Sequence, residues 1–214
     1  MPPICGWHTI TAMDPVAIHK PTFSQITILT RRRLIETLGA AVCLAPFALA
    51  GTPEFLETED NQEGPYYKKG APKRWSLADT GMAGTPFELT GRVFNTKGTA
   101  LPGAELDVWQ ANDAGDYDNS GFTLRGIAIA DENGVYKIRT ILPKHYKTGP
   151  NTYRPAHLHF KLRATGCKEL TTQLYFRGDK YNPVDTSVRP SLMLHPKDTG
   201  KSQSANFQFV LKAI

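Results

Sequence analysis

The 214-residue sequence has little cysteine, which limits what can hold its fold together. Of its three cysteines, Cys5 and Cys43 lie in an N-terminal segment that we assign to a leader, which leaves Cys167 alone. A single thiol excludes both an intramolecular disulfide and a cysteine-based zinc site in the rest of the chain. Stability must therefore come from a buried core, and a hydrophobic content of 40% is ordinary for a globular protein.

Long hydrophobic runs are also missing, since a membrane span needs about 18 or more apolar residues. The uncharged stretch 37–50 follows three arginines at 31–33 and ends in a small-x-small pattern before Gly51. This order predicts a signal peptide in residues 1–50, and the arginines resemble a twin-arginine export signal. We expect export to the periplasm without stable membrane insertion after cleavage. An ordinary secretory leader or an uncleaved anchor stays an alternative.

Charge of one sign is not concentrated anywhere in the chain. Twenty-five Lys and Arg residues face twenty Asp and Glu residues, and the net charge of +5 is scattered. The sequence contains no nucleic-acid-binding motif, so the short basic pairs 68–69 and 73–74 are interpreted as solvated surface. We expect no nucleic-acid partner.

Helical periodicity is absent after the leader, and from Phe87 onward apolar residues follow a period of two. Turn signals separate seven segments that are predicted as strands: 87–95, 104–111, 123–130, 135–142, 156–164, 170–176 and 206–213. This pattern predicts one all-β domain over residues 51–214, a two-sheet β-sandwich with long irregular loops. Residues 51–86 are expected to form an N-terminal arm over the sandwich, and residues 183–200 a second long loop.

Two histidines stand one residue apart in the predicted strand 156–164. Strand alternation places His157 and His159 on one face, about 6.5–7 Å apart along the chain, while Leu158 and Phe160 point to the other face. Two imidazoles at that spacing can converge on one cation. A His-x-His pair alone is a weak signal, which chance or core histidines satisfied by hydrogen bonds explain more often than a metal does.

Further metal ligands would have to come from other segments. Only His145 and His195 remain as histidines after the leader, but Tyr117 and Tyr146 lie in predicted loops. A phenolate is a hard anionic donor that suits a hard ferric ion, whereas zinc sites use His, Cys or carboxylate. A single loop tyrosine is more often a packing residue with a hydrogen-bonded hydroxyl.

Several linked motifs resemble those of the intradiol ring-cleavage dioxygenases. They occur in the order WQANDAGDY, LRG, TILPKHY, GPNTYRPAHLHF and LTTQLYFRGD, over roughly residues 64–179. The nearest likeness is to protocatechuate 3,4-dioxygenase subunits, with catechol 1,2-dioxygenases further off. The resemblance implies a mononuclear, non-haem Fe(III) enzyme that opens a catechol-type diol with O₂ to a muconate-type diacid.

The resemblance also implies roles for individual residues. Tyr117 matches the tyrosine that stays bound to the iron, and Tyr146 matches the tyrosine that substrate displaces. His157 and His159 match the histidine pair that completes the ligand set.

Four further positions carry over beyond the metal ligands. Arg154 matches the active-site arginine of the family, although a structural ion pair at the start of the strand is an alternative. Gln173 matches a glutamine near the iron, with a loop hydrogen bond as its alternative. Pro65 and Tyr66 resemble a substrate-side segment.

The sequence departs from the family pattern in two places. The segment from Tyr146 to Arg154 is shorter than in the family, and there is no N-terminal helical segment of the catechol 1,2-dioxygenase kind. A helix-mediated dimer is therefore not expected, while another homo-oligomer stays open. The sequence does not choose among protocatechuate, catechol, hydroxyquinol and related diols.

Two other classes of function remain at this point. The stretch LTGRVFNTKGTALPGAELDVWQA also fits a secreted, transthyretin-like β-sandwich that binds without catalysis. The histidine pair could also serve a zinc or copper enzyme. A binding module would have no reason to assemble the two tyrosines and two histidines around one point, and a wine-red colour with about one iron per chain would separate the dioxygenase from both alternatives.

Overall fold

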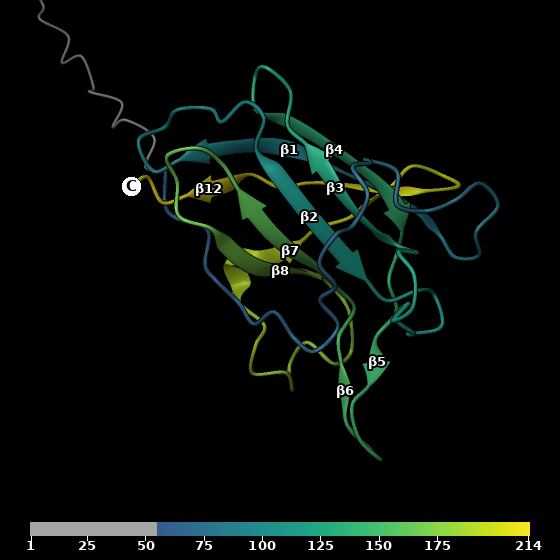
Figure 1. Cartoon of the computed structure of the whole chain (residues 1–214). Coiled ribbons are helices and arrows are strands. Elements are labelled where there is room, and N and C mark those ends of the chain that lie inside the picture. The colour runs from purple at the N-terminus through teal and green to yellow at the C-terminus, as the bar shows by residue number, and fades with distance from the viewer. Residues whose placement is uncertain (1–54) are drawn as a thin grey trace, which may run out of the picture. The chain divides into compact units, whose positions relative to one another are not determined.

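The structure is a computed structural model that describes residues 55–214 (Figure 1). This region contains strands, turns and one short 3₁₀ helix, η1 (Pro190–Leu192). In chain order the strands are β1 (Pro86–Asn95), β2 (Glu105–Gln110), β3 (Arg125–Ile129), β4 (Val135–Ile141), β5 (Tyr146–Lys147), β6 (Tyr153–Arg154), β7 (His157–Arg163), β8 (Leu170–Phe176), β9 (Met193–Leu194), β10 (Lys197–Asp198), β11 (Gln203–Asn206) and β12 (Phe209–Leu211).

Two predictions from the sequence concern the N-terminal segment. The leader at residues 1–50 and its export signal lie outside the described residues, so periplasmic export stays a prediction. Within residues 55–214, no helix is long and apolar enough to cross a membrane.

Two five-stranded sheets form the body of the domain. One has the strand order β3-β2-β7-β8-β9, and the other has the order β10-β11-β1-β12 with β4 paired to β1. Their inner faces meet in a common core, where Phe160 packs 5.0 Å from Phe209 and Phe87 packs 5.2 Å from Phe176, measured between ring centroids. The predicted all-β, two-sheet sandwich is confirmed.

A short hairpin of β5 and β6 stands apart from both sheets. Figure 1 shows it projecting away from the body of the domain, below the sheet that carries β7. Its register places Tyr146 opposite Arg154 and Lys147 opposite Tyr153. The segment that is short relative to the family is therefore a tight two-stranded hairpin.

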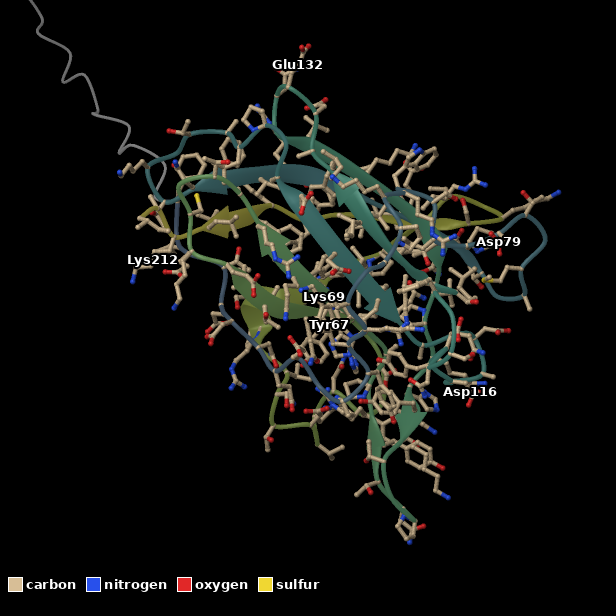
Figure 2. All side chains as sticks on the ribbon, in the orientation of Figure 1. Tyr67, Lys69, Asp79, Asp116, Glu132 and Lys212 are labelled. Carbon is tan, nitrogen blue, oxygen red and sulfur yellow. The ribbon has the colours of Figure 1, made fainter. Side chains whose placement is uncertain are left out.

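The N-terminal arm, residues 55–85 up to the start of β1, lies over the sandwich as predicted. Thr58 N donates to Val210 O, Asn61 N donates to Thr171 O, and Arg74 N donates to Ile127 O, so the arm is tied to both sheets. Tyr67 docks on the outer face of β2, where its hydroxyl lies 3.0 Å from Asp107 Oδ2 (Figure 2). The arm thus reaches the sheet that carries the histidine pair.

The predicted strand 206–213 is confirmed only in part: β12 lies within it, but its first residue, Asn206, ends β11, and the chain breaks between the two strands at Phe207. Both pieces pair in parallel with β1. At the break, Phe207 N donates to Thr90 O, and Tyr136 Oη donates to Phe207 O over 2.8 Å. The Phe207 carbonyl comes so close to Gly91 that a Cβ atom there would lie 1.7 Å from its oxygen. Any side chain at position 91 would therefore clash with the Phe207 carbonyl.

The Gly91→Ala substitution tests this close contact. Because backbone must move to admit the methyl group, we expect the free energy of unfolding to fall by at least about 1–3 kcal/mol, as overpacking does. Urea unfolding measures the change. The neighbouring Thr90→Ala variant is the control and should cost about 1 kcal/mol or less. Equal stability of Gly91→Ala and the wild type would show that the contact is not tight.

Candidate metal centre

Strand β7 carries the histidine pair between β2 and β8. His157 and His159 are 2% and 1% exposed, and their Nε2 atoms lie 3.0 Å apart. Leu158 and Phe160 are fully buried and belong to the hydrophobic core on the opposite face. The alternation expected from the sequence is therefore present, with both imidazoles on one face and aimed at one point.

Tyr117 reaches the same point from the loop between β2 and β3. Its hydroxyl oxygen lies 3.1 Å from His159 Nε2 and 3.5 Å from His157 Nε2. Asp118 fixes the loop directly after it, since its carboxylate accepts hydrogen bonds from the backbone N–H groups of Ser120, Gly121 and Thr123. A tightly turned loop thus presents the phenol to the histidines.

Tyr146 approaches from β5. Its ring is buried, 6% exposed, and lies 5.3 Å from the Tyr117 ring and 5.7 Å from the His157 ring. The structure therefore brings together all four side chains that the resemblance assigned to the metal.

A pocket of about 440 Å³ opens at these tyrosines. Asp116, labelled in Figure 2, is one of the residues that line it. Its lining includes four tyrosines, residues of the β5–β6 hairpin and residues of the loop around Tyr117: Tyr66, Ala114, Gly115, Asp116, Tyr117, Asn119, Lys144, His145, Tyr146, Lys147 and Tyr153.

Tyr66 forms one wall of this pocket and Pro65 does not. The Tyr66 ring stacks on Tyr117 with centroids 4.2 Å apart and planes at 12°, and it meets Tyr146 edge-on at 5.7 Å. Arg125 Nη1 donates to the Tyr66 carbonyl over 2.6 Å and holds the arm there. Pro65 is exposed and is absent from the residues that line the pocket.

Gly64 allows the arm to pass close to the histidines. Its φ is +71°, a conformation that favours glycine, and a Cβ atom there would lie 3.3 Å from His159 Cε1. This segment thus places the Tyr66 ring in the pocket, and the missing side chain at Gly64 leaves room for the His159 imidazole.

Arg154 and Gln173 belong to one hydrogen-bonded group behind the pocket. Arg154 Nη2 donates to Gln173 Oε1 over 3.0 Å and to Tyr175 Oη over 3.1 Å, while Arg154 Nε donates to Asp185 Oδ2 over 2.8 Å. Gln173 Nε2 in turn donates to the backbone oxygen of Gln62. Both alternatives from the sequence are thus partly realised, because Arg154 has a carboxylate partner and Gln173 ties down a loop.

The sequence did not single out Asp185, Tyr175 or Trp109. Trp109 stacks flat against His159, with centroids 4.8 Å apart and planes at 6°. Its position could have been inferred from the strand pairing of β2 with β7, which sets Trp109 opposite His159. Asp185 carried no such signal, since it lies in a long loop 31 residues from its partner.

The surroundings keep both imidazoles neutral. Burial and the nearby Arg154 lower the pKa of His157 to about 3, and burial with the neighbouring His157 lowers the pKa of His159 well below its usual value. His157 Nδ1 donates to Pro155 O over 2.6 Å, which leaves the lone pair on Nε2 facing His159 and Tyr117. Neutral imidazole is the form that binds metals.

The pKa values of the two tyrosines shift in the opposite direction to those of the histidines. Burial and the neighbouring Tyr146 raise the pKa of Tyr117 well above its usual value. Burial also raises the pKa of Tyr146, and Arg154 offsets part of that rise. A phenolate at either position therefore requires a positive charge beside it.

This donor set fits a single metal ion. Three donor atoms separated by 3.0–3.5 Å can share one ion at bond lengths of about 2.0–2.1 Å. Across residues 55–214, no group of three His, Cys, Asp or Glu side chains is placed to bind a metal. The phenol oxygens are therefore needed as donors, and two imidazoles with two phenols suit a hard, trivalent ion such as Fe(III).

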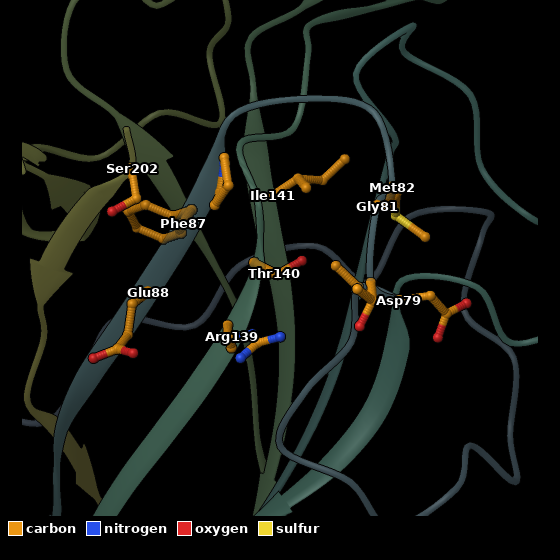
Figure 3. A pocket seen from close by; sticks show the side chains of 12 residues that line it. Asp79, Gly81, Met82, Phe87, Glu88, Arg139, Thr140, Ile141 and Ser202 are labelled. Atoms are coloured by element: carbon orange, nitrogen blue, oxygen red, sulfur yellow. The ribbon is translucent and has the colours of Figure 1, made fainter. Parts of the chain in front are cut away.

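A second pocket, of about 370 Å³, lies on the other sheet. Figure 3 shows Asp79 and Met82 on one side of it and Phe87 on β1 with Arg139 and Ile141 on β4 on the other. None of the converging tyrosines and histidines lines it. Tyr117 and Tyr146 line the first pocket instead.

Known proteins share this architecture and sequence. A family model described as Dioxygenase matches residues 62–213. Catechol 1,2-dioxygenase of Acinetobacter baylyi is 36% identical over 147 residues, which are 58% of this chain and 47% of that protein. Chlorocatechol 1,2-dioxygenase of a Pseudomonas species is 32% identical over 172 residues, which are 70% of this chain and 68% of that protein.

A solved structure is also similar to this chain in sequence and fold. The dioxygenase domain of a dioxygenase and carbohydrate-binding protein fusion from Streptomyces sp. SirexAA-E is 38% identical, with a TM-score of 0.69 over 74% of this chain and 99% of that one. This chain spans about half the length of the Acinetobacter enzyme and about two thirds of the Pseudomonas enzyme. A nearer likeness to protocatechuate 3,4-dioxygenase subunits stays a prediction.

Cleavage between carbons 1 and 2 of a catechol is cleavage between the two hydroxyl-bearing carbons, which defines the intradiol class. With the match over residues 62–213 and these 1,2-dioxygenase relatives, the chain belongs to the intradiol ring-cleavage dioxygenase family.

Proposed function

We propose that this chain is a mononuclear, non-haem Fe(III) dioxygenase that cleaves a catechol-type diol with O₂ to a muconate-type diacid. The observation that carries the proposal is the convergence of Tyr117 Oη with the Nε2 atoms of His157 and His159 within 3.5 Å, beside the Tyr146 ring. The relatives named for catechol and chlorocatechol support the substrate class.

The composition of the donor set favours this function over the two alternatives. A binding module without catalysis has no reason to bury two imidazoles and two phenols around one point at a cost in desolvation. A zinc or copper centre would be expected to use imidazole, thiolate or carboxylate in place of the phenols. When bound, the ferric ion would supply Lewis acidity and a template that orients the diol.

Three residues would hold the ion permanently. His157 and His159 are fixed by strand β7 and, for His157, by the hydrogen bond from Nδ1 to Pro155 O. Tyr117 is fixed by the turn that Asp118 caps and by the ring of Tyr66 stacked on it. These side chains have little freedom to leave.

Tyr146 is the residue whose place a substrate would take. It lies on the β5–β6 hairpin, outside both sheets, so its side chain can move without disturbing the core. Burial raises the pKa of Tyr146, so its oxygen is a strong base once it is a phenolate. Tyr146 Oη would therefore receive a proton from an incoming diol hydroxyl.

Arg154 would supply a fixed positive charge beside the reacting diol. Its guanidinium is held by Asp185, Gln173 and Tyr175 and cannot be deprotonated at ordinary pH. A preorganised cation stabilises negative charge that develops during ring opening. Gln173 would act by orienting this arginine.

The first prediction concerns iron and colour. Purified protein loaded with ferric iron should bind about one ion per chain and be wine-red, because tyrosinate-to-iron charge transfer absorbs visible light. Metal analysis and an absorption spectrum measure both. Protein that stays colourless after loading would contradict the ligand set.

Oxygen uptake with a panel of catechols should give colourless muconate-type products, and yellow extradiol products would contradict the reaction.

The second prediction concerns Tyr146. The Tyr146→Phe variant should keep its iron, held by the other three ligands, but weaken the visible band and lower kcat by about 10²–10⁴-fold, the range for loss of a general base. Steady-state kinetics and the spectrum test this. An unchanged spectrum with full activity would refute the role of Tyr146.

The third prediction concerns Asp118, which caps the loop that carries Tyr117. Asp118→Ala should lower iron affinity about 10–100-fold, as loss of an outer-shell partner does, because Tyr117 is no longer held in place. Competition with a chelator measures the affinity. Asp131 accepts backbone hydrogen bonds from Asn133 and Val135 in the β3–β4 turn, so Asp131→Ala is a matched control with unchanged affinity. Equal affinities of the two variants would exclude this role of Asp118.

A further inference from the structure

The loop between β8 and β9 brings one acidic side chain to the back of the pocket. Asp185 Oδ2 accepts a hydrogen bond from Arg154 Nε over 2.8 Å, and the two side chains are 8% and 13% exposed. A charge-assisted hydrogen bond at this burial is stronger than a surface ion pair and fixes geometry as well as charge. Asp185 is therefore a strong constraint on Arg154.

Asp185 is itself held in place. Its Oδ1 accepts the Ser187 N–H over 2.8 Å, and its own N–H donates to Tyr181 O over 3.2 Å. The backbone of Asp185 also accepts a hydrogen bond from Val188 N. The carboxylate thus comes from a turn that is closed on both sides, not from a freely moving loop.

The guanidinium is constrained along one edge. Its Nε is bound to Asp185, and its Nη2 is shared between Gln173 Oε1 and Tyr175 Oη. Tyr175 Oη also donates to Gln173 Oε1 over 2.8 Å, which closes the group. Arg154 pairs with Tyr146 in the β5–β6 hairpin, and its charge offsets part of the rise in the pKa of that phenol, which places the guanidinium close to Tyr146.

We propose that Asp185 is a positioning residue that fixes the Arg154 guanidinium against Gln173 and Tyr175, so that its positive charge stays beside Tyr146. The kinetic consequence rests on the dioxygenase function proposed above. The orientation of Arg154 does not, because it follows from hydrogen bonds in the protein alone.

A purely structural ion pair is the competing explanation. In that case Asp185 only ties the β8–β9 loop to the hairpin, and its loss lowers stability without changing chemistry. Asn182 provides a matched control in the same loop, since its Nδ2 donates to Phe176 O over 2.8 Å and not to a member of the arginine group. Asn182→Ala loosens the loop and leaves the arginine group intact.

Chemical labelling tests the positioning without metal or substrate. Phenylglyoxal modifies arginine, and mass spectrometry reads the rate at Arg154 in the metal-free protein. We expect Asp185→Asn to increase that rate several-fold and Asn182→Ala to leave it at the wild-type value. Equal rates in Asp185→Asn and wild type, or an equal increase in both variants, would overturn the proposal.

Kinetics with a catechol substrate test the consequence. We expect Asp185→Asn to lower kcat about 10–100-fold, as loss of an outer-shell partner does, with little change in KM. In an Arg154→Gln background the same substitution should have no further effect on the residual kcat, because Asp185 acts through Arg154. An additive loss in the double variant would overturn the proposal, as would an equal loss of kcat in Asn182→Ala.

The two assays separate failure of the inference from failure of the function. A wild-type protein without dioxygenase activity refutes the proposed function, while the labelling rates still decide whether Asp185 positions Arg154. An active wild type with Asp185→Asn equal to it in kcat refutes the catalytic consequence of the positioning.

Discussion

The register of β7 between β2 and β8 is the constraint on which the candidate metal centre depends. Leu158 and Phe160 are fully buried in the core, and this fixes His157 and His159 on the outer face. A slip of one residue would exchange the two sets and place imidazoles in the hydrophobic core. The packing that stabilises the sandwich therefore also aims the two imidazoles at one point.

Three separate segments complete the centre around that strand. The loop that carries Tyr117, the hairpin that carries Tyr146 and the arm that carries Tyr66 all meet in front of β7. Their burial disfavours charge, so the pKa values of the phenols are raised and those of the histidines are lowered. A trivalent cation would reverse this for the tyrosines, because it stabilises their phenolates. Metal binding is thus coupled to the protonation state of the two tyrosines.

Much of this arrangement follows from sequence, because it depends on local periodicity. Alternation predicted the sandwich strands and the shared face of His157 and His159, and linked motifs pointed to Tyr117 and Tyr146. Asp185 could not be predicted, since its contact with Arg154 depends on the path of a long loop. The break at Phe207 was missed for a similar reason: it follows from the approach of one carbonyl to Gly91 on β1, which no local pattern records.

X-ray diffraction at the iron absorption edge, from crystals of iron-loaded protein, tests the central claim most directly. The expected result is one anomalous peak per chain, within bonding distance of Tyr117 Oη and of the Nε2 atoms of His157 and His159. A peak at any other position, or iron bound without contact to either tyrosine, would contradict the proposed centre.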